Sequence, residues 1–263
     1  MISKKGSKSL NVLGRVILFY LLSIVIFATI SGLTKKLNFA DHLSISITSV
    51  LTLFLVILFA KWEKLKSSQI GLKVKNTSIP RFLSGFVIGI SMVLIQVLIV
   101  SNFAEVKFSL SSNYSFLNII SALFLYCVIA FREELVFRSY SLRSLAYSIN
   151  PLLALTILTA IFILEHVIAG VPLKMAIIGS GFGGILFGLA ALKTKGLALP
   201  LGLHFAWNFA QWLFGFKNNT GVWREIVKKG HESNAENIAL TGFVIAMIIG
   251  ITSVLLFYKK EKI

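Results

Sequence analysis

Residues 119–138 read IISALFLYCVIAFREELVFR, an apolar run that ends in four charged side chains. A helix needs about 20 apolar residues to cross the hydrocarbon core of a bilayer, and runs of that length recur along the chain. Eight such runs occupy residues 12–33, 43–62, 82–102, 116–147, 151–170, 173–193, 197–215 and 238–258. The sequence therefore predicts an all-α, polytopic membrane protein of about eight transmembrane helices, forming a single membrane domain over residues 1–263.

The overall composition supports the same class of protein. Of the 263 residues, 56% are hydrophobic and 14% are charged, whereas a soluble domain is about a quarter charged. This composition excludes an ordinary cytosolic enzyme, a disordered chain and a coiled coil. A net charge of +16 would indicate nucleic-acid binding in a soluble protein. Here the basic residues lie mostly between apolar runs, so we expect them to contact the lipid bilayer and not nucleic acid.

The distribution of Lys and Arg predicts the orientation of the chain. With eight spans and an internal N-terminus, the inner segments carry 18 basic residues and the outer segments carry 8. Cytoplasmic segments of membrane proteins are enriched in Lys and Arg, so we expect both termini in the cytoplasm. The first apolar run follows Lys4, Lys5 and Lys8 and is too long for a signal peptide, which predicts an uncleaved anchor.

Three of the predicted spans carry polar side chains that would be costly in lipid. A charge at the centre of a spanning helix costs about 2.5–3.5 kcal/mol on insertion scales, so such residues are candidates for function. They are Arg132, Glu133, Glu134 and Arg138 in the fourth span, Glu165 and His166 in the fifth, and His204 and Asn208 in the seventh. We expect four of them, Glu133, His166, His204 and Asn208, to line a water-filled cavity within the membrane.

The spacing of these residues predicts which side chains share a helix face. Glu134 and Arg138 are four residues apart, so they can pair as carboxylate and guanidinium. Glu133 is rotated by about 100° from Glu134 and is free to face another helix. His204 and Asn208 have the same spacing of four and can point into one cavity.

Three motifs occur in order on successive apolar runs: EExxxR over Glu133–Arg138, FxxxH over Phe162–His166 and HxxxN over His204–Asn208. In these motifs the chain resembles the CPBP family, the CAAX proteases and bacteriocin-processing enzymes also called Abi. The resemblance covers about residues 116–215 and implies an intramembrane glutamic endopeptidase that needs no cofactor. Its expected location is a bacterial cell membrane, and its expected substrate is a peptide or a membrane-tethered protein, as in bacteriocin or signalling-peptide processing or self-immunity.

The resemblance also implies a role for each motif residue. Glu133 would act with His166 to deprotonate the water that attacks the peptide bond. His204 and Asn208 would donate hydrogen bonds to the oxyanion of the tetrahedral intermediate. In the supporting set, Glu134 and Arg138 would form an internal pair that holds the helix, and Phe162 would pack beside His166.

Two alternatives stay open from the residues. Two His and one Glu from three helices could hold a zinc ion that activates water, although the chain has no HExxH motif. The other alternative is a non-enzymatic membrane scaffold, immunity factor or transporter that uses the buried polar cluster for binding. For Glu165, which points away from His166 on its helix, a solvated or helix-pairing role is expected.

Overall fold

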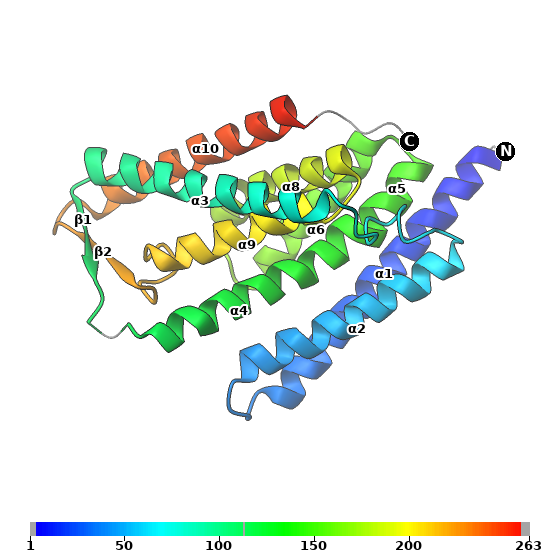
Figure 1. Cartoon of the computed structure of the whole chain (residues 1–263), viewed down its shortest axis with the longest axis horizontal. Helices are drawn as coiled ribbons and strands as arrows, with labels where there is room; N and C mark the ends of the chain where they lie inside the picture. Colours follow the sequence, from blue (N-terminus) through cyan, green and yellow to red (C-terminus); the bar gives the residue numbers. More distant parts are fainter. Residues whose placement is uncertain (1–3, 113, 259–263) are drawn as a thin grey trace.

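A computed structural model describes residues 4–112 and 114–258, with side chains from Ser9 onward (Figure 1). Two short strands accompany its helices. The α-helices are α1 (Lys4–Thr34), α2 (Ala40–Trp62), α3 (Ser78–Phe103), α4 (Phe116–Glu134), α5 (Leu142–Ser148), α6 (Pro151–Ile168), α7 (Leu173–Met175), α8 (Gly181–Thr194), α9 (Ala198–Leu213) and α10 (Glu232–Phe257). Two π-helices, η1 (Leu135–Ser141) and η2 (Ala176–Ser180), join α4 to α5 and α7 to α8. The strands are β1 (Val106–Leu110) and β2 (Trp223–Val227).

The prediction of an all-α polytopic membrane protein is confirmed. Six helical segments of the described chain are long and apolar enough to cross a membrane: α1, α2, α3, α6, α7 with η2 and α8, and α10. The other two predicted spans are α4, which continues through η1 into α5, and α9, which has 16 residues. These two carry the EExxxR and HxxxN motifs. The short α9 packs against α3, α4 and α8, and this protein contact shields its polar side chains from lipid.

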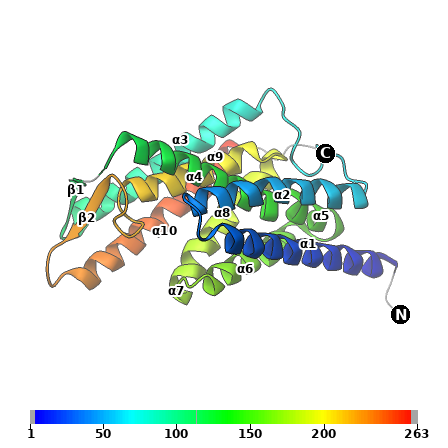
Figure 2. The ribbon, with the colours of Figure 1, turned by 90° about the horizontal axis from the view of Figure 1, so that it is seen from below.

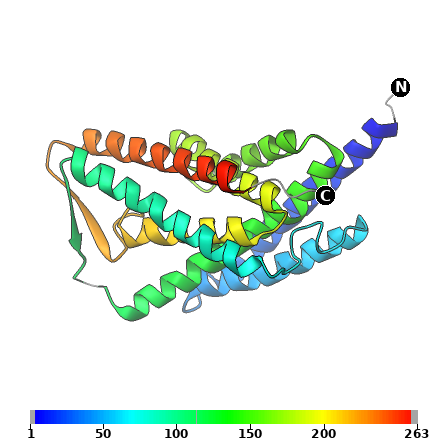
Figure 3. The ribbon, with the colours of Figure 1, turned by 45° about the horizontal axis from the view of Figure 1, so that its top comes forward.

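The helices run roughly along one direction, and the sheet lies at one end of the bundle. Figure 2 shows α1 and α2 side by side. In Figures 1 and 3, α10 runs from the sheet toward the end of the bundle at which α1 begins. The side chains of Lys4, Lys5 and Lys8, and the C-terminal residues 259–263, lie outside the described part. The cytoplasmic placement of both termini stays a prediction.

No strand is predicted from the sequence between the expected spans 82–102 and 116–147 or between 197–215 and 238–258, and the two strands of the structure lie in these segments. The strands pair antiparallel, with Val106 opposite Val227 and Leu110 opposite Trp223. Residues 106–110, VKFSL, alternate apolar and polar side chains, which is the period of a strand, whereas residues 223–227, WREIV, do not. The pairing ties the chain that follows α3 to the chain that follows α9.

Close packing between α3 and α9 depends on glycine. A methyl group on Gly202 of α9 would collide with the carbonyl oxygen of Phe82 in α3, and one on Gly85 of α3 would collide with the carbonyl oxygen of Leu199. The two backbones therefore approach one another without side chains between them. This contact fixes the position of His204, two residues after Gly202.

We expect Gly202→Ala to lower the free energy of unfolding in detergent by about 1–3 kcal/mol, because the added methyl forces α3 and α9 apart. Gly14→Ala in α1 is the matched control, since a Cβ at Gly14 meets nothing within 4 Å. The control should be neutral or slightly stabilising. Thermal unfolding of the two variants measures the difference, and equal melting temperatures would contradict the packing argument.

Candidate active site

The EExxxR motif lies where α4 passes into the π-helix η1. A π-helical turn is wider than an α-helical turn and often occurs at functional sites. Ser139 has φ −82° and ψ −105°, which marks a kink. Its hydroxyl donates a hydrogen bond to the carbonyl oxygen of Ile70 at 2.8 Å, and the hydroxyl of Ser141 donates to that of Val136 at 2.6 Å. The predicted single helix over 116–147 is therefore bent directly after the two glutamates.

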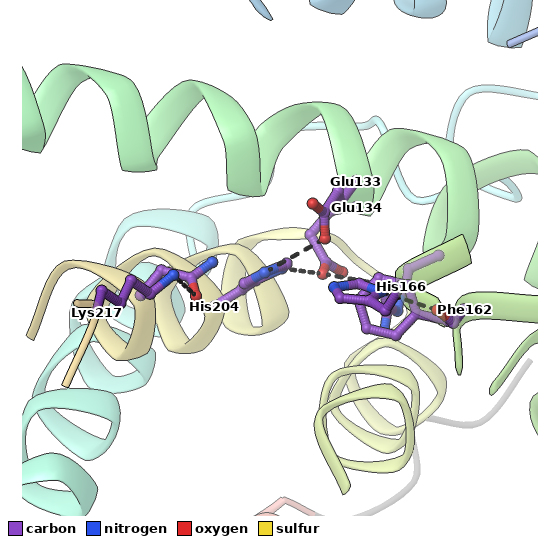
Figure 4. A network of polar contacts seen from close by, with 8 residues as sticks. Glu133, Glu134, Phe162, His166, His204 and Lys217 are labelled. Atoms are coloured by element: carbon purple, nitrogen blue, oxygen red, sulfur yellow. Dashed lines mark hydrogen bonds and ion pairs between the residues drawn. The ribbon is translucent and has the colours of Figure 1, made fainter. Parts of the chain in front are cut away.

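Glu134 is the centre of a buried ion-pair network between α4 and α9 (Figure 4). Its Oε1 atom lies 2.9 Å from His204 Nδ1 and 3.4 Å from an Arg138 guanidinium nitrogen. Glu134 is 0% exposed and Arg138 is 3% exposed, so the pair is shielded from water. The i,i+4 spacing of Glu134 and Arg138 indicates their contact, but the bond from His204 joins residues 70 positions apart.

His204 lies between two carboxylates. Its Nδ1 atom donates to Glu134, and its Nε2 atom lies 3.6 Å from Oε2 of Glu133. Phe187 of α8 stacks on the imidazole with the ring centroids 4.3 Å apart, and the guanidinium of Arg138 lies 5.6 Å from the centre of the same phenyl ring. The ring of His204 is thus fixed in plane and in direction. The sequence motifs do not include Phe187.

His166 is oriented by its own helix. Its Nδ1 atom lies 2.9 Å from the carbonyl oxygen of Phe162, which can only accept a hydrogen bond. The proton of the neutral imidazole is therefore on Nδ1, and Nε2 keeps a lone pair. The Phe162 and His166 rings pack edge to face, 4.5 Å between centroids. Figure 4 shows Glu133 and Glu134 between the His204 and His166 side chains in that view.

Glu133 and His166 line one half-open cavity of about 360 Å³ between α1, α2, α4 and α6. Glu165 lines the same cavity and accepts a hydrogen bond of 3.0 Å from the hydroxyl of Tyr20, so it does pair α6 with α1. Its place beside Glu133 was not expected from its spacing.

Residues outside the three sequence motifs also line the cavity. Phe27 and Ser31 of α1 and Asp41, Ser44 and Ile45 of α2 contribute to its lining. Arg132 also lines the cavity, is 4% exposed, and lies 4.3 Å from the centre of the Phe27 ring.

Asn208 lies one helical turn beyond His204 and is not among the residues that line this cavity. Its side-chain oxygen accepts a hydrogen bond of 3.1 Å from Nζ of Lys217, in the loop after α9. Lys217 lies 4.8 Å from the centre of the Tyr126 ring in α4. In the sequence, Lys217 is only one of the eight basic residues of the predicted outer segments, because its return to α9 depends on the shape of the loop.

The His, Cys, Asp and Glu side chains in the described part of the chain do not form a metal centre. Among residues 4–112 and 114–258, no group of three or more His, Cys, Asp and Glu side chains is arranged to hold a metal ion. Glu133 and His204 approach one another, while the other nitrogen of His204 is occupied by Glu134. The zinc alternative is tested by the chelator experiment described below.

Comparison with known proteins gives a family for the central segment. Residues 115–210 match the family described as Type II CAAX prenyl endopeptidase Rce1-like. No curated protein matches the chain. The matched segment contains all three motifs, so the resemblance to the CAAX protease family is confirmed there. Helices α1 to α3 and α10 lie outside the match.

Proposed function

We propose that this membrane protein, which carries a CAAX-protease-type segment at residues 115–210, hydrolyses a peptide bond within the membrane by means of glutamate-activated water. One observation carries the proposal: the carboxylate of Glu133 and the imidazole of His166 line the same half-open cavity. A carboxylate and a neutral imidazole can both accept a proton from a bound water molecule. The cavity lies against α1, α2 and α6, which are long and apolar enough to cross a bilayer.

The first step is the attack of water. Glu133 and His166 hold the water, one of them takes a proton, and the water oxygen forms a bond to the carbonyl carbon of the substrate. The carbonyl oxygen gains the negative charge. Asn208 supplies two N–H donors for this oxyanion, because its own oxygen is already bonded to Lys217.

His204 can then move the proton. Its Nδ1–H is engaged with Glu134, and its Nε2 faces Glu133. A proton taken up by Glu133 can pass to Nε2, where the resulting N–H donates to the oxyanion. When the C–N bond breaks, the leaving nitrogen accepts the proton, and the carboxylic acid and amine products leave the site. Phe187 and Glu134 keep the His204 ring in place through both steps.

The proposed substrates are peptides or membrane-tethered proteins, including bacteriocin or signalling-peptide precursors in a bacterial cell membrane. The first experiment incubates the detergent-purified protein with peptides that carry a lipidated cysteine and with the same peptides without lipid. Mass spectrometry identifies the cleaved bond.

We expect cleavage that a strong chelator does not reduce. Loss of cleavage to the chelator, with recovery on addition of zinc, would replace the water-activation scheme by the metal alternative. A folded protein that cleaves none of the peptides would favour the scaffold, immunity or transport alternative. Binding of an uncleaved peptide would then be measured with the same preparations.

A further inference from the structure

The loop between α9 and β2 (residues 214–222) turns the chain back onto the site. Gly215 has φ +85°, and a Cβ there would lie 2.6 Å from the carbonyl oxygen of Trp223. Asn219 closes the loop on β2, because its side-chain oxygen accepts a 2.7 Å hydrogen bond from the backbone N–H of Glu225. The loop is therefore a tight turn with a fixed shape.

Lys217 is the residue of this loop whose side chain reaches Asn208 in α9. Its ammonium donates to Oδ1 of Asn208 and lies over the ring of Tyr126 in α4, at the distances given above. The backbone oxygen of Lys217 accepts a 2.9 Å hydrogen bond from the hydroxyl of Thr220, which holds its main chain. Lys217 is half-buried, and in the view of Figure 4 its side chain lies on the far side of His204 from His166.

Burial also changes the proton affinity of this amine. Loss of hydration lowers the pKa of Lys217 from its ordinary value to about 8, and the carboxylate of Glu133 opposes this shift. Lys217 and the proposed base therefore influence one another electrostatically. In the described part of the chain, the ammonium contacts the ring of Tyr126 in α4 and the side chain of Asn208 in α9, and it interacts electrostatically with Glu133 of α4.

A carboxamide can present either its oxygen or its amino group to a cavity. An ammonium group has three donors and no acceptor, so it binds the oxygen of Asn208 and directs the NH₂ group away from itself. A charge-assisted hydrogen bond is about twice as strong as a neutral one, and it further polarises the N–H bonds of the amide. Lys217 thus favours the one orientation of Asn208 that can donate to an oxyanion.

We infer that Lys217 is a positioning residue of the oxyanion site, which it serves by fixing the side chain of Asn208. The inference rests on the proposed function and adds to it a residue beyond the segment matched to the family. Lys217 is bonded to Asn208 and would act on the oxyanion only through that amide. Its contribution should be found in the chemical step and not in substrate binding.

The test compares kcat and KM for wild type, Lys217→Met and Lys217→Arg. Removal of an oxyanion donor costs about 10²–10³-fold in kcat, so misorientation of Asn208 should cost about tenfold or more, with KM within about twofold. Lys217→Arg keeps a cationic donor and should retain most of kcat. Lys228→Met is the matched control, because it removes a cation that pairs with Glu105 on the exposed surface. This control should cleave like wild type.

A pH profile separates positioning from packing. Wild-type kcat should fall as the pH rises through about 8, since the ammonium form is lost there. In Lys217→Arg this decline should move to higher pH, because a guanidinium keeps its proton. A decline that stays at the same pH in Lys217→Arg would overturn the inference.

A double-mutant cycle with Asn208 gives the decisive comparison. In an Asn208→Ala background, Lys217→Met should lower kcat by less than about twofold, because no amide remains to be positioned. An equal loss in both backgrounds would overturn the inference, as would wild-type kcat in Lys217→Met. Failure of wild type and Lys228→Met to cleave any peptide would instead overturn the proposed function, and this inference with it.

Discussion

Glu133→Gln is expected to lower kcat for peptide cleavage by about 10²–10⁴-fold, the usual contribution of a general base. The amide has the size of the carboxylate but cannot take a proton from water. Glu133 is partly exposed, at 19% of its side-chain surface, and its contact with His204 is as long as 3.6 Å. Loss of its charge should therefore leave the fold intact. Rates and thermal unfolding of the purified variant measure the two effects.

Glu165→Gln is the comparison for Glu133→Gln, because it changes a second carboxylate in the same cavity. Glu165 is held by the hydroxyl of Tyr20 in α1, and we expect its loss to cost no more than about tenfold. If Glu165→Gln abolished cleavage while Glu133→Gln retained it, the base would be Glu165. If both variants kept wild-type rates, neither carboxylate would activate water.

Glu134→Ala is expected to lower the free energy of unfolding by about 3–5 kcal/mol, since it leaves a buried guanidinium without its partner. Both Arg138 and His204 lose their contact with Oε1 in this variant. Cleavage should also become slower, because Glu134 no longer holds the imidazole of His204 in position. Denaturant or thermal unfolding in detergent measures the first effect, and kcat measures the second.

Two further variants separate charge from shape at Glu134. Glu134→Gln keeps an oxygen that accepts from His204, so its loss of stability should be smaller. In the double variant Glu134→Ala with Arg138→Met, no buried charge is left unpaired, so it should be more stable than Glu134→Ala alone. A double variant that is less stable than Glu134→Ala would contradict the role of Glu134 as counter-ion.

Much of the fold was predictable because apolar length directly reflects the thickness of a bilayer. The pairing of Glu134 with Arg138 was predictable for a similar reason, since i,i+4 spacing is a property of a single helix. The π-helical bend after Glu134 has no comparable signal. The strand at 106–110 does have one in its alternating side chains, whereas the strand at 223–227 does not, and each strand is only five residues long and lies between helices.

The contacts between helices could not be predicted from spacing. The approach of His204 to Glu133 depends on how far α9 slides along α4, which glycine contacts with α3 determine. The contact of Lys217 with Asn208 depends on the turn of the loop after α9. Both contacts are set by tertiary packing. No periodic pattern in the sequence predicts such contacts.

The α1–α2 hairpin has a separate consequence. Its side chains Phe27, Ser31, Asp41, Ser44 and Ile45 form one wall of the cavity, yet it lies outside residues 115–210, which hold every proposed catalytic residue. Under the proposed function, the α1–α2 hairpin contributes to substrate selection, while residues 115–210 perform the chemistry. The two functions therefore lie in different segments of the chain. Natural variation or engineering in α1 and α2 can then alter which peptide is accepted while the residues proposed for hydrolysis stay the same.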